Sequence, residues 1–124
     1  MKFSPLVFLA LSVLAHPAWA DGDAAQGEQI FKKCGACHTV ADKTNKVGPS
    51  LLGVVGRKVA SVPDYTYSDS MKEYAATGAI WDEKTLDTYL TDPKAVVGHT
   101  KMAFPGLKVQ AERDNLIAFL KTKN

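Results

Sequence analysis

Apolar residues recur at helical spacing near the start and the end of the chain. One segment begins after Asp23, whose side chain can cap a helix N-terminus, with Gln26 three residues further on. Another begins around Ala111. Because steps of three and four residues place side chains on one helix face, both segments are predicted to be amphipathic helices. Their apolar faces consist of Gly27, Ile30, Phe31 and Cys34 in the first and Leu116, Ile117, Phe119 and Leu120 in the second.

Two shorter helices are predicted between these segments. Asp82 or Glu83 opens one of them, which must stop by Pro93 because proline disfavours helical backbone in the residue before it. A weaker candidate spans Asp69–Ala76 and ends at Gly78, since glycine commonly follows a helix C-terminus. The first of the two carries Leu86, Tyr89 and Leu90 on its apolar face.

The rest of the chain is rich in glycine and proline and has no alternating run long enough to predict a strand. The pattern therefore predicts an all-α fold of about four short helices joined by long, irregular loops. Long loops are uncommon in a compact domain of this kind. They are expected here if they wrap a large apolar ligand that replaces part of the core.

The N-terminal segment, residues 1–20, differs from the remainder. Lys2 precedes a short apolar run over residues 6–15, and Ala18-Trp19-Ala20 fits the small-x-small pattern of a cleavage site. A membrane-spanning helix needs about 20 apolar residues, so this run is too short for a permanent anchor. We interpret residues 1–20 as a cleavable signal peptide and residues 21–124 as one exported domain, located in the periplasm without stable membrane insertion.

Charge excludes one class of function. Removal of residues 1–20 removes Lys2 and no acidic residue, so the formal net charge falls from +2 to +1. A nucleic-acid-binding domain needs a dominant basic surface, which this balance does not supply. Any functional charge must therefore lie in a local patch.

Both cysteines of the chain lie in one short motif, Cys34-Gly35-Ala36-Cys37-His38. This pattern is typical of covalent haem attachment. The two thiols would form thioether bonds to two vinyl groups of one porphyrin, and the adjacent His38 would then be delivered to the iron. A ligand held next to a covalent bond loses little entropy on binding. The motif predicts one haem c.

Three other interpretations of the motif are weaker. A thioredoxin-like dithiol is expected between a strand and a helix, a context that is absent here. A zinc site would need a second pair of ligands, and the adjacent Cys37 and His38 do not readily fill neighbouring tetrahedral positions. A disulfide between Cys34 and Cys37 would close too small a loop to stiffen the domain.

The sixth position of an iron bound by one histidine decides its function. An open position allows ligand binding or oxygen chemistry, whereas a strong protein ligand restricts the iron to electron transfer. The candidates are His99, Met71 and Met102. A lone methionine usually fills a core, but Met102 lies in a segment that lacks helical periodicity and has turn residues on both sides.

The chain resembles the class I cytochromes c, especially the soluble bacterial members that are close to mitochondrial cytochrome c. The likeness runs from about Asp23 to Asn124. It rests on Gly27-x-x-Ile30-Phe31, Cys34-x-x-Cys37-His38, Gly48-Pro49, Gly56-Arg57, Tyr65-Thr66-Tyr67, Trp81, Asp92-Pro93-Lys94, Thr100-Lys101-Met102-x-Phe104 and Leu116-Ile117-Ala118-Phe119-Leu120.

This resemblance implies the cytochrome c fold around one haem attached through Cys34 and Cys37, with His38 and Met102 as the axial ligands. It further implies that the Pro49 carbonyl orients the His38 ring, which would raise the basicity of that ligand.

The resemblance also implies roles for residues around the haem. Tyr89 matches a residue whose hydroxyl approaches the methionine sulfur, and Phe104 one that screens the haem edge. Ordinary core packing is the alternative for both of them and for Trp81. Gly27 and Phe119 match the contact at which the terminal helices cross. The residues that match hydrogen-bond partners of a buried haem propionate are Arg57, Tyr67 and Trp81.

By resemblance, the protein is a monomeric electron carrier and not an enzyme. Its implied partners are a quinol–cytochrome c reductase as donor and a terminal oxidase or photosynthetic reaction centre as acceptor, in respiration or photosynthesis. A dedicated acceptor for one periplasmic dehydrogenase is the alternative, and a haem enzyme or gas sensor would require a labile sixth position. Transient docking would use a ring of lysines at positions that match the family's basic face: Lys33, Lys46, Lys94, Lys101 and Lys108.

The chain departs from the family pattern in three places. Gly98-His99 stands where related proteins often have Pro-Gly, which predicts a looser approach to Met102. Met71 stands where mitochondrial forms have an amide side chain. The stretch over residues 72–80 is slightly longer than in the mitochondrial form.

Overall fold

The computed structural model of the chain describes Met1, Ser12 and residues 22–124. The signal peptide predicted for residues 1–20 therefore lies outside the described residues, apart from two isolated positions, and it stays a prediction. The described part contains no strand, only an isolated antiparallel bridge between Lys58 and Ile80. Its helices are α1 (Ala24–Phe31), α2 (Asp69–Ala76), α3 (Glu83–Thr91), α4 (Pro93–Val96) and α5 (Gln110–Lys121).

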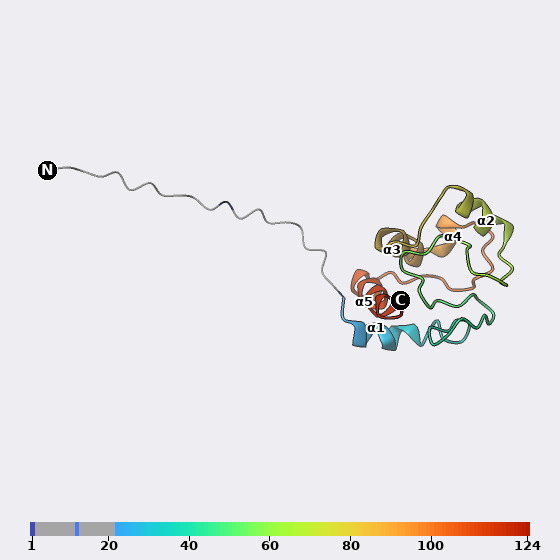
Figure 1. The fold of residues 1–124 in the computed structure, drawn as a ribbon, viewed down its shortest axis with the longest axis horizontal. Helices are drawn as coiled ribbons and strands as arrows, with labels where there is room; N and C mark the ends of the chain where they lie inside the picture. The colour runs from blue at the N-terminus through green and yellow to red at the C-terminus, as the bar shows by residue number, and fades with distance from the viewer. Residues whose placement is uncertain (2–11, 13–21) are drawn as a thin grey trace.

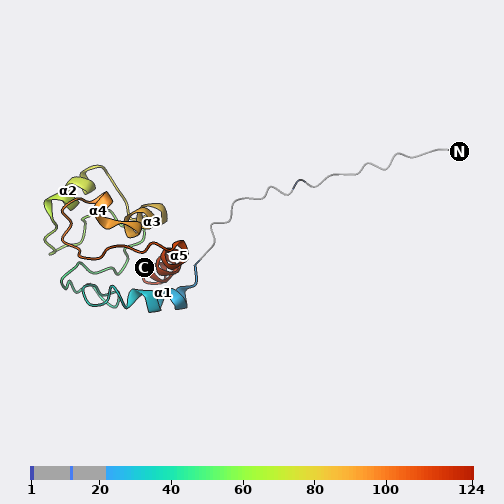
Figure 2. The same cartoon turned by 180° about the vertical axis from the view of Figure 1, so that it is seen from behind.

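The terminal helices α1 and α5 make the most extensive helix–helix contact of the described chain, and Figures 1 and 2 show them crossing side by side. The Asp23 carboxylate caps α1, as predicted, by accepting from the backbone N–H groups of Ala25 and Gln26. Gly27 is required at the crossing, because a Cβ there would lie 1.9 Å from the Asn115 carbonyl oxygen and 2.8 Å from the Phe119 Cβ. The predicted contact between Gly27 and Phe119 is confirmed.

Side-chain caps also set the starts of α2 and α3. Ser68 accepts from the backbone N–H of the third residue of α2, and Asp82 does the same for α3. The helix over residues 69–76 ends before Gly78, which takes a φ of +82° as expected after a helix C-terminus. Both predicted helices are confirmed, with Asp82 as the cap and not the first residue of α3.

The short helix α4 was not predicted. The helix before it ends at Thr91, in keeping with the expected stop by Pro93. Proline is compatible with the first position of a helix, where its missing N–H would have no intrahelical partner, and Pro93 takes that position in α4. Asp92 assists by accepting from the Ala95 N–H.

The buried core lies between α3, α5 and the loops that face them. The long loops over residues 32–68 and 97–109 close around the remaining side of the molecule, as Figure 1 shows. Within the described residues no helix is long and apolar enough to cross a membrane. The core side chains include Val54, Trp81, Leu86, Tyr89, Leu90, Leu107, Leu116, Ile117, Phe119 and Leu120.

Candidate functional site

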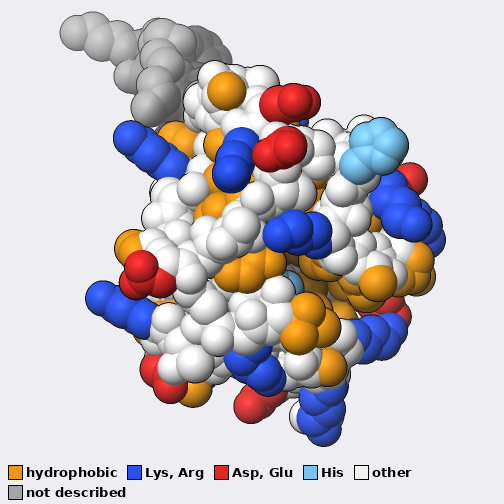
Figure 3. All heavy atoms as spheres, turned by 90° about the vertical axis from the view of Figure 1, so that its right-hand side faces the viewer, with side chains coloured by type: hydrophobic (Ala, Val, Ile, Leu, Met, Phe, Trp, Pro, Cys, Tyr) orange, Lys and Arg blue, Asp and Glu red, His pale blue; other side chains and the backbone are white. Residues whose placement is uncertain are grey.

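A cavity of about 790 Å³ opens between the helices and the long loops. This volume lies within the range of about 300–1,000 Å³ that is usual for ligand pockets. Figure 3 shows a hollow on one face of the molecule, with hydrophobic side chains and a small part of a histidine side chain visible inside it. The structure brings together at this cavity all the site residues that the sequence predicted: Cys34, Cys37, His38 and Met102.

The turn that follows α1 presents three of these residues to the cavity. Its backbone continues the coil of the helix, since the Cys37 and His38 N–H groups both donate to the Cys34 carbonyl, at 3.1 and 2.9 Å. The Cys34 N–H in turn donates to the Phe31 carbonyl at 2.7 Å. Local hydrogen bonds therefore place both sulfurs and the imidazole along one wall of the cavity.

The two thiols are free, with Cys34 half-buried and Cys37 exposed. Burial raises the pKa of the Cys34 thiol, while the charge of Lys33 partly opposes that rise. A redox-active dithiol needs the opposite, a thiol whose pKa is lowered so that the thiolate is populated. The environment of Cys34 therefore does not favour the thioredoxin-like alternative.

His38 is held in one orientation by a backbone carbonyl. Its Nδ1 lies 2.7 Å from the Pro49 oxygen, which can only accept, so Nδ1 carries the proton and Nε2 keeps its lone pair. Burial lowers the pKa of the imidazole, and the charges of Arg57 and Lys46 lower it further. The hydrogen bond to Pro49 opposes this decrease in pKa. A neutral ring with a fixed Nδ1–H is the form in which histidine binds a metal. The contact implied between Pro49 and His38 is confirmed.

Gly48 packs against the face of this ring. A Cβ at Gly48 would lie 2.3 Å from Cε1 and 2.7 Å from Nδ1 of His38, so the ring would have to move. We expect Gly48→Ala to lower the free energy of unfolding by about 1–3 kcal/mol, the usual cost of overpacking a fixed site. Chemical denaturation of the purified protein measures this change.

A matched control for Gly48→Ala is Gly98→Ala, because a Cβ at Gly98 would meet no atom within 4 Å. This variant is expected to unfold at nearly the same denaturant concentration as the wild type. Equal stability of both variants would show that the close approach of Gly48 to His38 does not constrain the ring.

Met102 and His99 occupy different environments. Met102 is half-buried at the cavity, whereas His99 is exposed and is not among the residues that line it. His99 also takes a φ of +55°, in the left-handed region that glycine adopts without strain. The second methionine, Met71, lines the same cavity from α2.

Thr100 is a residue of the site that the sequence did not single out. Its hydroxyl accepts from the Met102 N–H at 3.2 Å, and its side chain also hydrogen-bonds to Tyr89. Burial raises the pKa of Tyr89, so the phenol stays protonated. A threonine hydroxyl that accepts from the backbone N–H two residues later forms a local turn, so a threonine at this spacing before a functional side chain is a sequence signal for that turn. The implied approach of the Tyr89 hydroxyl to sulfur stays a prediction.

Arg57 supplies an unpaired polar atom at the cavity. Its Nη1 donates to the Leu52 carbonyl at 3.1 Å, while its buried Nε has no hydrogen-bond partner among the described residues. Tyr67 accepts from the Val62 N–H at 3.1 Å, which leaves the phenolic proton available for donation. Trp81 also lines the cavity. An anionic group of a ligand would satisfy these donors, because an unmade buried hydrogen bond is costly.

The lysines predicted for docking are all exposed, and Lys33 and Lys101 lie at the cavity itself. Lys101 donates to the Thr66 carbonyl at 3.0 Å, and Lys46 to the Gly35 carbonyl at 2.8 Å. Figure 3 shows Lys and Arg side chains around the hollow. Cationic side chains thus lie near the mouth of a largely apolar cavity.

Comparison with known proteins identifies relatives of the whole described domain. The family model described as Cytochrome c matches residues 24–124. The cytochrome c2 of Rhodomicrobium vannielii is 48% identical over 116 residues, which cover 93% of this chain and 90% of that protein.

Solved structures give the same result. Cytochrome cH from Methylobacterium extorquens superposes with a TM-score of 0.75 at 46% identity, covering 82% of this chain and 100% of that one. Cytochrome c2 from Rhodospirillum centenum superposes with a TM-score of 0.78 at 37% identity, covering 82% and 98%. The predicted fold is therefore confirmed.

Proposed function

The chain belongs to the cytochrome c family, whose members bind haem c covalently and transfer electrons, and from this premise we propose that it is a soluble, periplasmic, monohaem electron carrier. It would shuttle single electrons between membrane redox complexes and would catalyse no reaction of its own. The proposal includes removal of residues 1–20 on export, so that residues 21–124 form the mature, monomeric domain.

In this proposal Cys34 and Cys37 hold the haem through thioether bonds, and His38 and Met102 are its axial ligands. The residues fit such a group, since a cavity of about 790 Å³ carries both sulfurs, an imidazole with a fixed tautomer and a thioether. Bound haem supplies a one-electron couple. The donors that would receive a propionate are Arg57, Tyr67 and Trp81.

The observation that carries the proposal is the presence of both His38 and Met102 at one cavity. Two protein ligands would leave no open position on the iron of a bound haem, which favours electron transfer over ligand binding. The largely apolar lining would disfavour water, and the soft Met102 sulfur would favour ferrous iron and a higher potential than a second histidine would. The test is exposure of the reduced protein to carbon monoxide near neutral pH, followed by optical spectroscopy. We expect no adduct, whereas ready binding would indicate a haem enzyme or a gas sensor.

Docking would use the lysines near the cavity mouth. Exposed ion pairs contribute only about 0–1 kcal/mol each to stability, so these lysines have little structural value. Complementary charge instead raises association rates from about 10⁵–10⁶ toward 10⁸–10⁹ M⁻¹s⁻¹ at low salt. The partners we propose are a quinol–cytochrome c reductase and a terminal oxidase or reaction centre, because a shuttle must bind each of them fast and weakly.

Electron transfer to an anionic partner is expected to slow steeply as salt rises, because the Debye length falls to about 10 Å at 0.1 M. Replacement of Lys33, Lys94 or Lys101 by glutamate is expected to slow it further at low salt. Stopped-flow kinetics with purified reductase and oxidase measure both effects.

Lys84→Glu provides the matched control for the Lys33 and Lys101 variants, because Lys84 is exposed on α3 and, unlike those two lysines, is not among the residues that line the cavity. It makes the same change in net charge as the other variants and is expected to slow the reaction less. Electron-transfer rates that do not change with ionic strength would show that the lysines are solvated surface charges with no role in docking. Rapid transfer with a periplasmic dehydrogenase alone would favour the dedicated-acceptor alternative.

A further inference from the structure

The chain that follows Met102 packs against the C-terminal end of α3. The Leu107 N–H donates to the Leu90 carbonyl at 2.7 Å, and Lys108 Nζ donates to the Thr91 carbonyl at 2.7 Å. Gly106 has a φ of +105°, and a Cβ there would lie 2.3 Å from the same Thr91 oxygen. Residues 106–108 therefore contact the helix backbone directly.

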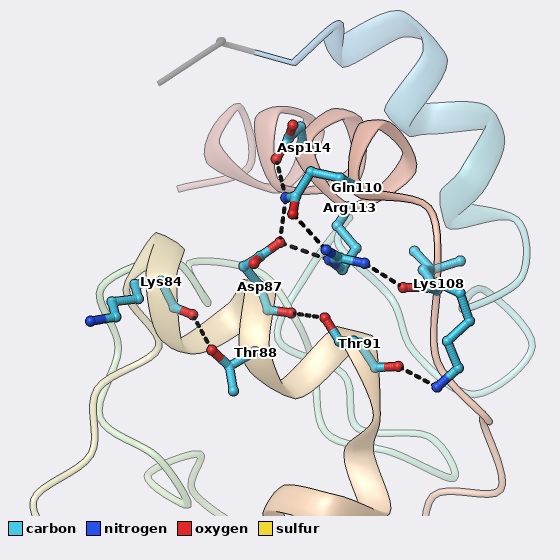
Figure 4. Close-up of polar contacts among 9 residues, drawn as sticks. Lys84, Asp87, Thr88, Thr91, Lys108, Gln110, Arg113 and Asp114 are labelled. Carbon is cyan, nitrogen blue, oxygen red and sulfur yellow. Dashed lines mark hydrogen bonds and ion pairs between the residues drawn. The ribbon is translucent and has the colours of Figure 1, made fainter. Parts of the chain in front are cut away.

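A buried guanidinium connects residues 106–108 to both α3 and α5. Arg113 of α5 is only 7% exposed. Its Nη1 donates to the Leu107 carbonyl and its Nε to Asp87 Oδ1 on α3, both at 2.8 Å. Figure 4 shows Arg113 between Asp87 and the chain that leads to Lys108. One side chain of α5 thus joins the chain just before that helix to Asp87 of α3, which lies 26 residues away.

Gln110 completes the arrangement. Its Nε2 donates to Asp87 Oδ1 at 2.8 Å, and its Oε1 accepts from Arg113 Nη2 at 2.6 Å. The same amide nitrogen lies 2.9 Å from Asp114 Oδ1. All three nitrogens of the Arg113 guanidinium therefore have partners, which makes the network rigid. Charge-assisted bonds of this kind are about twice as strong as neutral ones.

The chain before Met102 is anchored by the buried Val97, whose N–H donates to the Pro93 carbonyl at 2.9 Å, but the residues between Val97 and Met102 are more exposed. His99 is exposed at a φ of +55°, Gly98 is exposed, and Lys101 donates to the Thr66 carbonyl at the surface. Exposed contacts of this kind contribute little to stability because water replaces them readily. The attachment of the Met102 segment that hydrogen-bonds to both α3 and α5 is the downstream one, at Leu107.

We propose that Asp87 and Arg113 are positioning residues for Met102. By holding the Leu107 carbonyl, they keep the downstream end of the segment fixed to α3 and α5, and so they confine the Met102 sulfur to the cavity. This inference rests on the proposed axial role of Met102. It assigns to a partly buried ion pair of the described chain a function in ligand retention, in addition to its part in helix packing.

The test measures how readily imidazole displaces Met102 from the ferric, haem-loaded protein. The apparent affinity for an external ligand rises in proportion to the population in which the sulfur has left. Arg113→Lys keeps the charge but lacks the planar fork of donors that bonds Leu107 and Asp87 together, and Asp87→Asn weakens the other side of the pair. Loss of such a bond is expected to raise the imidazole affinity by about tenfold to a hundredfold.

Two controls separate positioning from general stability. Val59→Ala shortens a core side chain that is 4% exposed and does not line the cavity. Glu83→Gln removes another ion pair between α3 and α5, that of Glu83 with Lys121. We expect both variants to bind imidazole like the wild type, even where Val59→Ala unfolds as easily as Arg113→Lys.

Amide hydrogen exchange at Leu107 gives a readout that does not depend on the haem. Protection of this N–H is expected to fall in Arg113→Lys below the level set by global unfolding, and to follow global unfolding in Val59→Ala.

An unchanged imidazole affinity in both variants of the pair, or an equal rise in Val59→Ala, would overturn the positioning role. A wild-type protein that binds imidazole as tightly as Met102→Ala would instead overturn the axial role of Met102, and the positioning role with it.

Discussion

Replacement of Cys34 or Cys37 by serine is expected to prevent accumulation of normal haem-loaded protein. A hydroxyl does not form the thioether bond, so the haem would no longer be covalently held. The cavity of about 790 Å³ would then lack the group that fills it. Because a domain of about a hundred residues has only a modest core, loss of its filler is expected to destabilise the whole fold. Haem-stained gels and the Soret absorbance of periplasmic extracts measure the loss.

Ala36→Ser is the matched control for the cysteine variants. Ala36 is exposed and lies between the two cysteines in the same turn, so this change introduces serine without removing a sulfur. It is expected to give normal yields of haem-loaded protein. Recovery of a folded, haem-free Cys34→Ser protein with full helix content would contradict the view that the haem forms part of the core.

Met102→Ala is expected to abolish the weak long-wavelength band that marks sulfur on ferric haem and to lower the midpoint potential. The physical reason is that loss of the soft thioether removes the preference for ferrous iron. His99→Ala is expected to leave both properties nearly unchanged, because His99 is exposed and is not among the cavity residues. Optical spectra and redox titration of the two purified variants measure the difference.

The opposite result would identify a different ligand set. If His99→Ala removed the native spectrum while Met102→Ala preserved it, the protein would be a bis-histidine carrier. A band that survives Met102→Ala but not the additional change Met71→Ala would point to the second methionine of the cavity. Each outcome assigns the sixth ligand to one named side chain.

Local patterns predicted most of the helices correctly. Asp23, Ser68 and Asp82 accept hydrogen bonds from the first turns of α1, α2 and α3, and interactions of this kind span only two or three residues. The start of α5 was predicted to within one residue: the helix begins at Gln110, and the prediction was Ala111. The short helix at Pro93 was missed because proline both stops one helix and can open the next.

Side chains that act over long separations were harder to predict. Arg113 carries a charge in the polar part of the α5 sequence, so its pattern is that of a solvated residue. Its burial depends on Asp87, which lies 26 residues away, and on the Leu107 carbonyl. Thr100 likewise acquires its role from Tyr89 on a different segment. No local pattern contains these partners, because the folded backbone brings them together.

The sequence by itself determined the haem-attachment motif, since Cys34, Cys37 and His38 lie within one turn whose geometry is set by its own hydrogen bonds. Only the tertiary structure decided that Met102 faces the cavity while His99, three residues earlier, faces solvent. That choice depends on attachments of the segment to α3, to Arg113 of α5 and to Thr66. Such contacts form only when distant segments pack, and a short stretch of sequence does not encode them.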